Sequence, residues 1–490
     1  MFLRLRYDTI RNKQKKRRRI NVKGILRIIL ICLGCFLIYV ALGAILPFAV
    51  TKNKSGDLTH EIAAFYEPSN LKERAALVEE NEDALITRLS MIEEAKKEII
   101  LSTFDIRTGK STTDIFSALI AAADRGVKVK VYVDGMYGLI HMTGQTIFEA
   151  AGSHENLEIR YYNTPNLLMP WTINGRMHDK YLVVDDQMVL LGGRNTFDYF
   201  VGSYTPNSVG YDREVLIWQG EKDEKGVGAV AQVKTYFKEN WDNSCSKTVF
   251  DKKKGKKIEE ELESLRQHYK EMKENEKFSV SEDWQGRTVE IENAVLVTNP
   301  THIMKKSPDV WYTMSELMKQ AKENVIIQTP YAVFSKDMYK GIEEIAKTVP
   351  DTKMLINSTA VGDNVVASCD YTKNWKKVVG TGMPVYEYHG EHSCHGKSIL
   401  IDDQLSAIGS YNFDMRSTYI DTETMLVING KEFQKLLRKE VKKIEDESLP
   451  RKADGSYETD EAVEEKHLST GGKVLYKVGS WIIQPFRYLV

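Results

Sequence analysis

A short motif that occurs twice places the strongest constraint on the fold of this chain. The first copy runs from His178 to Asn195 and the second from His395 to Asn412, and both fit His-x-Lys-x4-Asp-x6-Gly-x-x-Asn. In a chain with 10 histidines, one bare His-x-Lys-x4-Asp arises by chance in roughly one such sequence in twenty. Two copies with the same extension therefore indicate a duplication.

The sequence before each motif repeats as well. Residues 95–103 (AKKEIILST) and 321–329 (AKENVIIQT) both have the pattern of an amphipathic helix that continues into a buried strand. A further helix and strand are predicted after each of them, at 113–125 and 127–134 in the first copy and at 336–348 and 353–357 in the second. Alternating helices and strands predict an α/β sandwich with mixed or parallel sheets, and the repetition predicts two such domains.

The spacing inside the motif brings a histidine and a lysine together. Residues two apart on a strand point to the same face, so both side chains can reach one anion. The apolar run after the lysine predicts a buried strand that holds the pair rigidly. The closing asparagine, Asn195 or Asn412, follows the next strand and could place an amide near the same phosphate. A surface strand with solvated side chains would explain one motif alone, but not two matched copies.

The first 50 residues predict a membrane anchor. Residues 1–27 hold 11 Lys and Arg against one acid, Asp8, and residues 28–50 are 23 uncharged, largely apolar residues. A helix of that length spans roughly 35 Å at about 1.5 Å per residue, enough for a bilayer core of about 30 Å. A cleaved signal peptide would have a shorter apolar region, and buried core helices are seldom uncharged over this length. The basic leader predicts a cytoplasmic N-terminus, with the body on the other side of the membrane.

The charge of the chain is divided between two regions. The total is 68 basic and 69 acidic residues, a formal net charge of −1. Because residues 1–27 carry about +10, the remaining residues carry about −11. A basic leader suits an anionic membrane surface, whereas an acidic body disfavours nucleic acid as a partner.

The cysteines and the remaining histidines predict neither a disulfide framework nor a metal site. Two of the five cysteines lie in the apolar segment, and the other three are widely spaced. His389, His392, Cys394 and His395 are close in sequence, but His395 belongs to the motif, which leaves too few ligands for a structural zinc. No cofactor is expected.

With the duplicated α/β halves, the two motifs resemble those of the phospholipase D superfamily over roughly residues 80–440. Within that superfamily, residues 192–198 (GGRNTFD), 409–417 (GSYNFDMRS) and the downstream Thr422-Glu423 look like bacterial cardiolipin synthases. Three features depart from the pattern. Gly193 stands where Ser is common, an insertion of about eight residues precedes the Asp-Arg-Glu that follows the first motif, and one anchor is present where many cardiolipin synthases begin with two.

The resemblance implies two phospholipase D-like α/β sandwich domains related by a pseudo-twofold axis and preceded by one transmembrane helix. The predicted boundaries are a leader at 1–27, a membrane helix at 28–50, a first domain at 51–245, a charged linker or insert at 246–287, a second domain at 288–445, and a charged tail with an apolar C-terminal segment at 446–490. That last segment has the composition either of an interfacial membrane-seeking helix or of a helix docked on the domain.

The resemblance also implies one active site built by both motifs without a metal. One histidine forms a phosphohistidine and the other serves as general acid and base. His178 is the expected nucleophile and His395 the expected acid and base, although the residues alone do not fix this order. The other expected members are Lys180, Lys397, Asn195 and Asn412 at the phosphate, Glu214 and Glu423 as orienting groups on the histidine rings, and Asp185 and Asp402 as the acids of each motif, which support the local fold.

Several functions follow from this resemblance. The one that fits best is a membrane-anchored phosphatidyltransferase that makes cardiolipin from phosphatidylglycerol and a second phospholipid, either phosphatidylglycerol or phosphatidylethanolamine. A hydrolytic phospholipase D that releases phosphatidic acid is the alternative, because one sequence does not show whether water or an alcohol is the acceptor. The acidic body disfavours a nuclease, and two intact motifs disfavour an inactive scaffold. The expected partners are phospholipid substrates and the membrane.

Overall fold

Two compact units make up this chain in the computed structural model. The first holds Met1–Thr51 and Pro165–Ile173, and the second holds Lys52–Thr164 and Asn174–Val490. The structure describes residues 2–206, 208–221, 223, 225–251, 254–278, 282–458 and 462–490.

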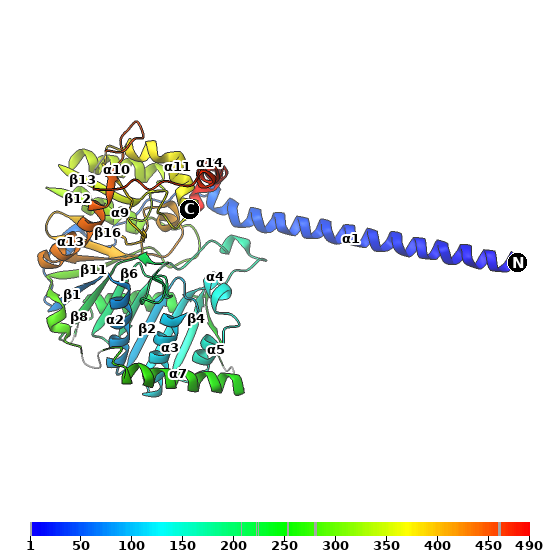
Figure 1. Cartoon of the computed structure of the whole chain (residues 1–490), viewed down its shortest axis with the longest axis horizontal. Coiled ribbons are helices and arrows are strands. Elements are labelled where there is room, and N and C mark those ends of the chain that lie inside the picture. The colour runs from blue at the N-terminus through cyan, green and yellow to red at the C-terminus, as the bar shows by residue number, and fades with distance from the viewer. Residues whose placement is uncertain are drawn as a thin grey trace. The chain divides into compact units, whose positions relative to one another are not determined.

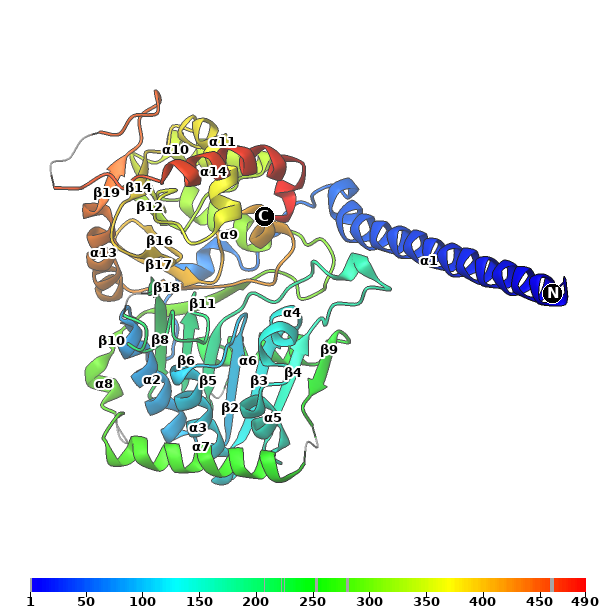
Figure 2. The same ribbon diagram turned by 45° about the vertical axis from the view of Figure 1, so that its right-hand side comes forward.

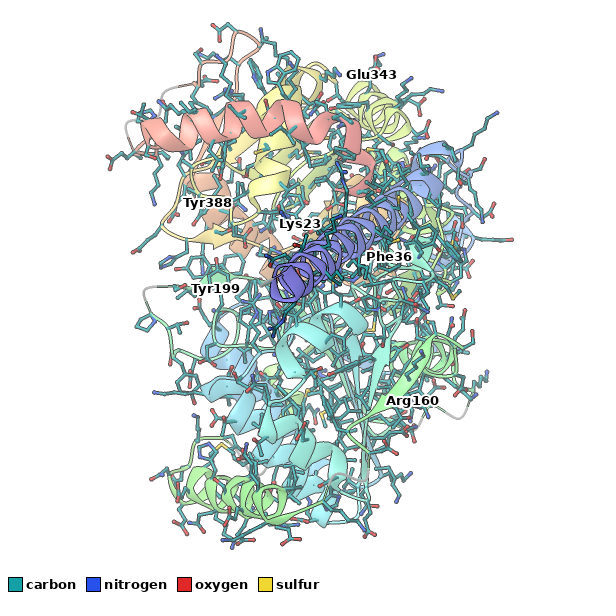
Figure 3. The ribbon with its side chains drawn as sticks, turned by 90° about the vertical axis from the view of Figure 1, so that its right-hand side faces the viewer. Lys23, Phe36, Arg160, Tyr199, Glu343 and Tyr388 are labelled. Atoms are coloured by element: carbon teal, nitrogen blue, oxygen red, sulfur yellow. The ribbon has the colours of Figure 1, made fainter. Side chains whose placement is uncertain are left out.

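One long helix, α1 (Phe2–Val50), dominates the first unit. The basic leader therefore continues into the apolar segment without a break, whereas the sequence analysis placed the membrane helix at 28–50. Within α1, Val22–Val50 is long and apolar enough to cross a membrane, judged by length and composition. Phe36, labelled in Figure 3, lies in this apolar part.

A nine-stranded sheet forms the first half of the second unit, here residues 73–290. Its strand order is β10-β1-β8-β6-β5-β2-β3-β4-β9. The strands are β1 (Glu73–Val78), β2 (Glu98–Thr103), β3 (Lys128–Asp134), β4 (Leu157–Tyr162), β5 (Tyr181–Val184), β6 (Met188–Gly192), β8 (Glu214–Gln219), β9 (Ser246–Val249) and β10 (Val289–Glu290). β2, β3 and β4 run parallel, and the other neighbours pair antiparallel.

An eight-stranded sheet repeats this arrangement in the second half, residues 293–490. Its order is β11-β18-β17-β16-β12-β13-β14-β19, again with one parallel group, β12-β13-β14. The strands are β11 (Asn293–Thr298), β12 (Asn324–Gln328), β13 (Asp351–Asn357), β14 (Val385–Tyr388), β16 (Ser398–Ile401), β17 (Leu405–Gly409), β18 (Thr424–Asn429) and β19 (Ser448–Pro450). Position by position this is the order β1-β8-β6-β5-β2-β3-β4-β9 of the first sheet, which confirms the predicted duplication of an α/β unit with a mixed sheet.

Helices cover both sheets (Figure 1). In the first half they are α2 (Asn81–Glu94), α3 (Lys110–Asp124), α4 (Gly135–Tyr137), α5 (Thr146–Ser153), α6 (Ala229–Trp241), α7 (Lys256–Glu274) and α8 (Trp284–Arg287). In the second half they are α9 (Asp309–Lys319), α10 (Lys336–Thr348), α11 (Val365–Val379), α12 (Met415–Tyr419), α13 (Lys431–Asp446) and α14 (Thr470–Ile483).

Three hydrophobic cores hold these layers together. α2, α3 and α5 pack on one face of the first sheet, and α9, α10 and α11 pack on one face of the second. The third core lies between the two sheets and includes α6 and α13. β2 illustrates how the sequence produces this layering: Ile99 and Leu101 enter the outer core, and Ile100 between them enters the core between the sheets.

The charged stretch 246–287, expected to be a linker or insert, packs on the first half. It holds β9, α7 and α8, and α7 lies across α3 and α5 (Figure 2). Ile258, Leu265 and Met272 are buried, and Leu262 and Tyr269 between them are partly buried against the same core. This spacing of three and four residues is an amphipathic pattern, although Lys and Glu outnumber the apolar residues of the helix. Residues 252–253 and 279–281 of this stretch lie outside the described residues.

Candidate active site

The two motifs meet where the halves face each other. The backbone N–H of His178 donates to the carbonyl oxygen of Thr422 at 3.3 Å and to its hydroxyl at 3.2 Å. The backbone N–H of His395 donates to the carbonyl oxygen of Tyr211 at 2.6 Å. Next to His395, β15 (Ser393–Cys394) pairs in parallel with β7 (Gly210–Tyr211). The backbone of each histidine is therefore held by the opposite half.

A carboxylate from the opposite half also contacts each histidine ring. His178 Nδ1 lies 2.9 Å from Glu423 Oε1, and His395 Nδ1 lies 2.6 Å from Asp212 Oδ2. The rings are nearly buried, with exposed fractions of 8% for His178 and 9% for His395. A carboxylate on Nδ1 fixes the tautomer and ring orientation, and it leaves Nε2 as the nitrogen for chemistry.

Glu214, which the sequence analysis expected to orient a histidine, does not reach His395. Its carboxylate accepts hydrogen bonds of 2.8 and 2.6 Å from Arg88 and lies 3.4 Å from Nε of Arg194. The acid beside His395 is instead Asp212, two residues earlier in the chain. Glu214 thus belongs to a buried ion pair beneath the site.

Strand register explains this correction. In the first sheet the motif glycine, Gly192, pairs with Glu214, and in the second sheet its equivalent, Gly409, pairs with Met425. Glu214 and Met425 are therefore equivalent positions. Asp212 and Glu423, each two residues earlier in the chain, are then the structurally equivalent acids. The prediction of Glu214 was wrong because it assumed a glutamate in both halves, whereas the first half uses the aspartate of Asp-Arg-Glu, residues 212–214.

The two motif lysines are buried beside the histidines, each only 1% exposed. Lys180 Nζ donates to the carbonyl oxygen of His178 at 2.5 Å, and Lys397 Nζ lies 2.6 Å from Nδ1 and 3.2 Å from Nε2 of His395. Burial lowers the pKa of Lys180 to about 7 and also lowers the pKa of Lys397, while the nearby Glu423 and Asp212 oppose these shifts. An anion bound between them would favour their charged forms.

One motif amide lines the cavity of the site, and the other contacts a side chain of the cavity wall. Asn412 Nδ2 donates to the hydroxyl of Tyr331 at 3.1 Å, and Asn195 lines the cavity described below. The Oδ1 atoms of both asparagines are buried, and no described residue of the chain forms a hydrogen bond with them. Buried polar atoms without partners indicate a place for a ligand, and an amide flip would present N–H groups instead of oxygen.

A cavity of about 600 Å³ opens onto both histidines. Six aromatic side chains contribute to its wall: Phe104, Tyr137, Phe197, Tyr199, Phe200 and Tyr331. The Phe104 ring meets His178 edge-on at 4.7 Å between centroids, and the Phe200 ring lies 5.2 Å from His395. Tyr199 belongs to the segment that follows the first motif and is labelled in Figure 3. The cavity is larger than one phosphate requires, and its wall suits an organic group on either side of that phosphate.

The charge state differs between the two histidine–carboxylate pairs. Burial alone would raise the pKa of Asp212, but Lys397 and His395 lower it to about 2. Burial raises the pKa of Glu423 to about 7 despite the nearby Lys180. Burial and the two lysines hold the pKa of His178 well below its ordinary value, so this ring is neutral near pH 7.

The residue that lies next to each of these acids, Ser410 or Gly193, differs between the halves. Ser410 donates its hydroxyl to Glu423 in the second half. Gly193 occupies the equivalent place in the first half, where a Cβ atom would overlap Oδ1 of Asp212. The departure at Gly193 thus follows from the short aspartate that approaches it. Thr422 in turn donates its hydroxyl to Asp179, a buried motif residue, at 2.8 Å.

Asp185 and Asp402 stay away from the histidine pair. Each has a left-handed backbone, with φ of 52° and 53°, and its carboxylate accepts backbone N–H bonds from the residues that enter the neighbouring strand. Asp185 bonds to residues 96–98 at 2.7–2.9 Å, and Asp402 to residues 322–324 at 2.8–3.1 Å. The two acids thus tie each motif strand, β5 or β16, to the start of its neighbour, β2 or β12.

The sequence neighbours of His395 do not gather around a metal. His389 Nδ1 accepts the backbone N–H of Lys466 at 3.1 Å, and His392 packs on the Tyr211 ring. Across the described part of the chain, no group of three or more His, Cys, Asp and Glu side chains is placed to hold a metal ion.

The paired α/β halves and the crossed histidine–carboxylate contacts define one site that is built by two repeats. The family model described as cardiolipin synthase, PLD-like domain, matches residues 89–241 and 314–444. The chain therefore belongs to this phospholipase D-like family, as its motifs predicted.

Curated relatives and solved structures agree with this membership. An uncharacterized protein of Helicobacter pylori strain J99 is 27% identical over 430 residues, which cover 78% of this chain and 82% of that protein. Cardiolipin synthase C of Escherichia coli K12 is 25% identical over 405 residues, 74% of this chain and 82% of its own length. The crystal structure of phosphatidylserine synthase from Haemophilus influenzae matches the fold with a TM-score of 0.59 at 14% identity, over 86% of this chain and 98% of that one.

Proposed function

We propose that this protein is a phosphatidyltransferase that makes cardiolipin from phosphatidylglycerol and a second phospholipid. The observation that carries the proposal is the pair of histidines that open onto one cavity, each oriented at Nδ1 by a carboxylate of the opposite half. The family model and the cardiolipin synthases among the relatives support the lipid substrate class.

In the first step, Nε2 of His178 attacks the phosphorus of the donor lipid. The bond between phosphorus and the headgroup oxygen breaks, and His395 gives that oxygen its proton. The neutral ring of His178 supports its role as nucleophile, because a protonated ring has no free electron pair. The ionised Asp212 on Nδ1 of His395 suits a ring that carries a proton before this transfer.

In the second step, the terminal hydroxyl of phosphatidylglycerol attacks the phosphohistidine. His395 takes the hydroxyl proton, the bond between phosphorus and Nε2 of His178 breaks, and cardiolipin leaves. Lys180 and Lys397 neutralise the non-bridging oxygens in both steps, and Asn195 and Asn412 offer N–H groups to them. Asp185 and Asp402 act through the fold, not at phosphorus.

An alcohol acceptor is favoured over water by the cavity wall. Aromatic rings flank both histidines, and the volume of about 600 Å³ leaves room for a second lipid headgroup beside the donor phosphate. Hydrolysis to phosphatidic acid is the alternative outcome at the same site.

The experiment is a product assay on the full chain reconstituted in vesicles. With phosphatidylglycerol alone, we expect cardiolipin and free glycerol in equal amounts. Adding labelled phosphatidylethanolamine tests the second donor, since its use would release ethanolamine. Phosphatidic acid without cardiolipin would identify a hydrolase. If the wild type leaves the lipids as unchanged as the His178→Ala control does, both activities are excluded.

We also propose that α1 anchors the protein in the membrane, with a cytoplasmic N-terminus and the two phospholipase D-like domains, near 51–245 and 288–445, on the other side. The apolar span Val22–Val50, uncharged from residue 28 onward, and the basic leader support this placement. Protease protection in sealed vesicles of known orientation tests this topology. If the two domains are digested only by protease on the cytoplasmic side, the proposed orientation is wrong.

A further inference from the structure

The C-terminal helix α14 has two unlike faces. Its inner face packs on α11, where Tyr476 and Ser480 are buried and Gly479 lies so close to Cys369 that a Cβ atom would meet its sulfur (Figures 1 and 2). Arg487, just beyond the helix, donates to both carboxylate oxygens of Asp370 at 2.9 and 3.1 Å. The helix is thus fixed and cannot turn its outer face inward.

The outer face is apolar and exposed. We define this outer face by Val474, Leu475, Val478, Trp481 and Ile482, each more than half exposed. Their spacing of three and four residues forms one stripe along the helix. A stripe of this kind on a fixed helix carries a cost in water unless something covers it.

The charge around this stripe points to the covering partner. Residues 470–490 contain no acid, and Lys473 and Lys477 are exposed on α14. Lys373 of α11 places its Nζ 3.3 Å from the centroid of the Trp481 ring. Large apolar side chains with a tryptophan, flanked by lysines, match the interface of an anionic bilayer, where the apolar groups enter the lipid and the ammonium groups meet phosphates.

The same surface is linked to the cavity. α11 begins at Val365, which lines the cavity that holds His178 and His395, and Val365 and Val366 are 47% and 44% exposed. At the other end of the segment, the carbonyl oxygens of Leu489 and Val490 accept hydrogen bonds of 3.1 and 2.9 Å from Arg416. Arg416 lies in α12, four residues after Asn412 of the second motif.

We propose that the outer face of α14 is a second membrane contact, which sits in the headgroup region of an anionic phospholipid surface and holds the cavity mouth at that surface. This proposal rests on the proposed lipid substrate. It differs from the anchor: α1 ties the protein to a membrane, whereas α14 sets the distance of the active site from the lipid. Of the two predictions for the C-terminal segment, the docked helix is confirmed, and the interfacial role of its outer face is part of this proposal.

The first test does not depend on activity. The full chain and a Trp481→Phe variant are reconstituted in phosphatidylglycerol vesicles that contain brominated lipid chains, which quench tryptophan on contact. We expect quenching of the wild type to exceed that of the variant, with the difference assigned to Trp481. Equal quenching in both proteins would overturn the proposal, whatever lipid product the enzyme makes.

The second test separates the surface from the chemistry. Val478→Glu places a charge on the outer face, and Leu436→Glu is the matched control, because Leu436 is 41% exposed on α13. We expect Val478→Glu to lower turnover of bilayer phosphatidylglycerol about tenfold, a loss of roughly 1.4 kcal/mol, with turnover of a soluble short-chain analogue unchanged. Equal losses with both substrates would mean a damaged fold. If Val478→Glu changes the oligomer size and leaves bilayer turnover unchanged, the outer face of α14 binds a second copy of the chain and the proposal is wrong.

Discussion

The two halves of this protein share a strand order and a motif, but they differ at the carboxylate behind each histidine. In the second half Glu423 contacts His178, accepts the hydroxyl of Ser410 and has a pKa raised to about 7 by burial. In the first half the shorter Asp212 contacts His395, leaves no room for a side chain at the place of Ser410, and has a pKa of about 2. The duplication thus supplies two similar sites, and we propose that the acid in each sets the role of the histidine that it contacts.

The sharpest way to break this comparison is to remove each histidine separately. His178→Ala and His395→Ala should each lower transfer from phosphatidylglycerol by about a thousandfold or more, because each removes a whole catalytic role. With a donor whose leaving group is nitrophenol, which departs without protonation, His395→Ala should still form the phosphoenzyme and His178→Ala should not. Rapid quench with a phosphorus-labelled donor measures this intermediate.

The exposed His467 provides the control, since His467→Ala should leave both assays unchanged. A phosphoenzyme in His178→Ala, together with none in His395→Ala, would exchange the two roles between the halves.

Exchanging Gly193 and Ser410, the small residues next to the two acids, gives the next prediction. Gly193→Ser should lower turnover about a hundredfold, because its Cβ overlaps Oδ1 of Asp212 and overpacking of this kind costs about 1–3 kcal/mol. Ser410→Gly should cost about tenfold, because it creates no overlap and removes a hydroxyl that donates to Glu423 and accepts the backbone N–H of Thr424. Kinetics on purified variants with matched melting temperatures measure both. Equal effects would mean that the acids are not positioned differently in the two halves.

Much of the fold was predictable from the sequence, because the duplicated segments share one pattern of apolar residues. The β2 and β12 strands, the helices after them and the buried runs after Lys180 and Lys397 all follow from local apolar periodicity. The packing of α7 was not predicted, because the many Lys and Glu residues around its five apolar residues favour a solvated helix.

The site divides in the same way. The motif predicted the histidines, lysines and amides, although each His–Lys pair lies just before a strand, β5 or β16, and not on it as the spacing suggested. The carboxylates come from the opposite half and depend on register. An Asp-Arg-Glu offers two acids, and only the pairing of Glu214 with the motif glycine of its own sheet shows that Asp212 is the one that faces His395. Such cross-half contacts leave no periodic pattern in a single sequence.

A pH profile sharpens the comparison between the acids. Glu423 must be ionised to accept the Nδ1 proton of His178, and its pKa is raised to about 7, so turnover should fall as the pH drops below 7, toward tenfold per unit. Asp212 stays ionised over this range because its pKa is about 2. Glu423→Gln should therefore lose the acidic limb, on a lower plateau, whereas Asp212→Asn should keep it. An acidic limb that survives in Glu423→Gln would move this titration to another group.

The smallest effect on turnover is expected where the halves are most alike. Asp185 and Asp402 hold the same left-handed turn and the same three backbone N–H groups in their respective halves. Replacing either by Asn keeps one acceptor oxygen and loses the charge, so each variant should lose about 1–2 kcal/mol of stability. That corresponds to a melting temperature a few degrees lower, with kcat near that of the wild type.

Thermal unfolding of the detergent-solubilised full chain, followed by kinetics below the transition, tests this pair. Equal losses of stability in Asp185→Asn and Asp402→Asn fit acids that tie each motif strand to its neighbour. A large drop in kcat at unchanged melting temperature would instead place these carboxylates in the chemistry. If only one of the two variants lost kcat, the divergence between the halves would extend beyond Asp212 and Glu423, because two acids with the same local geometry would no longer share one structural role.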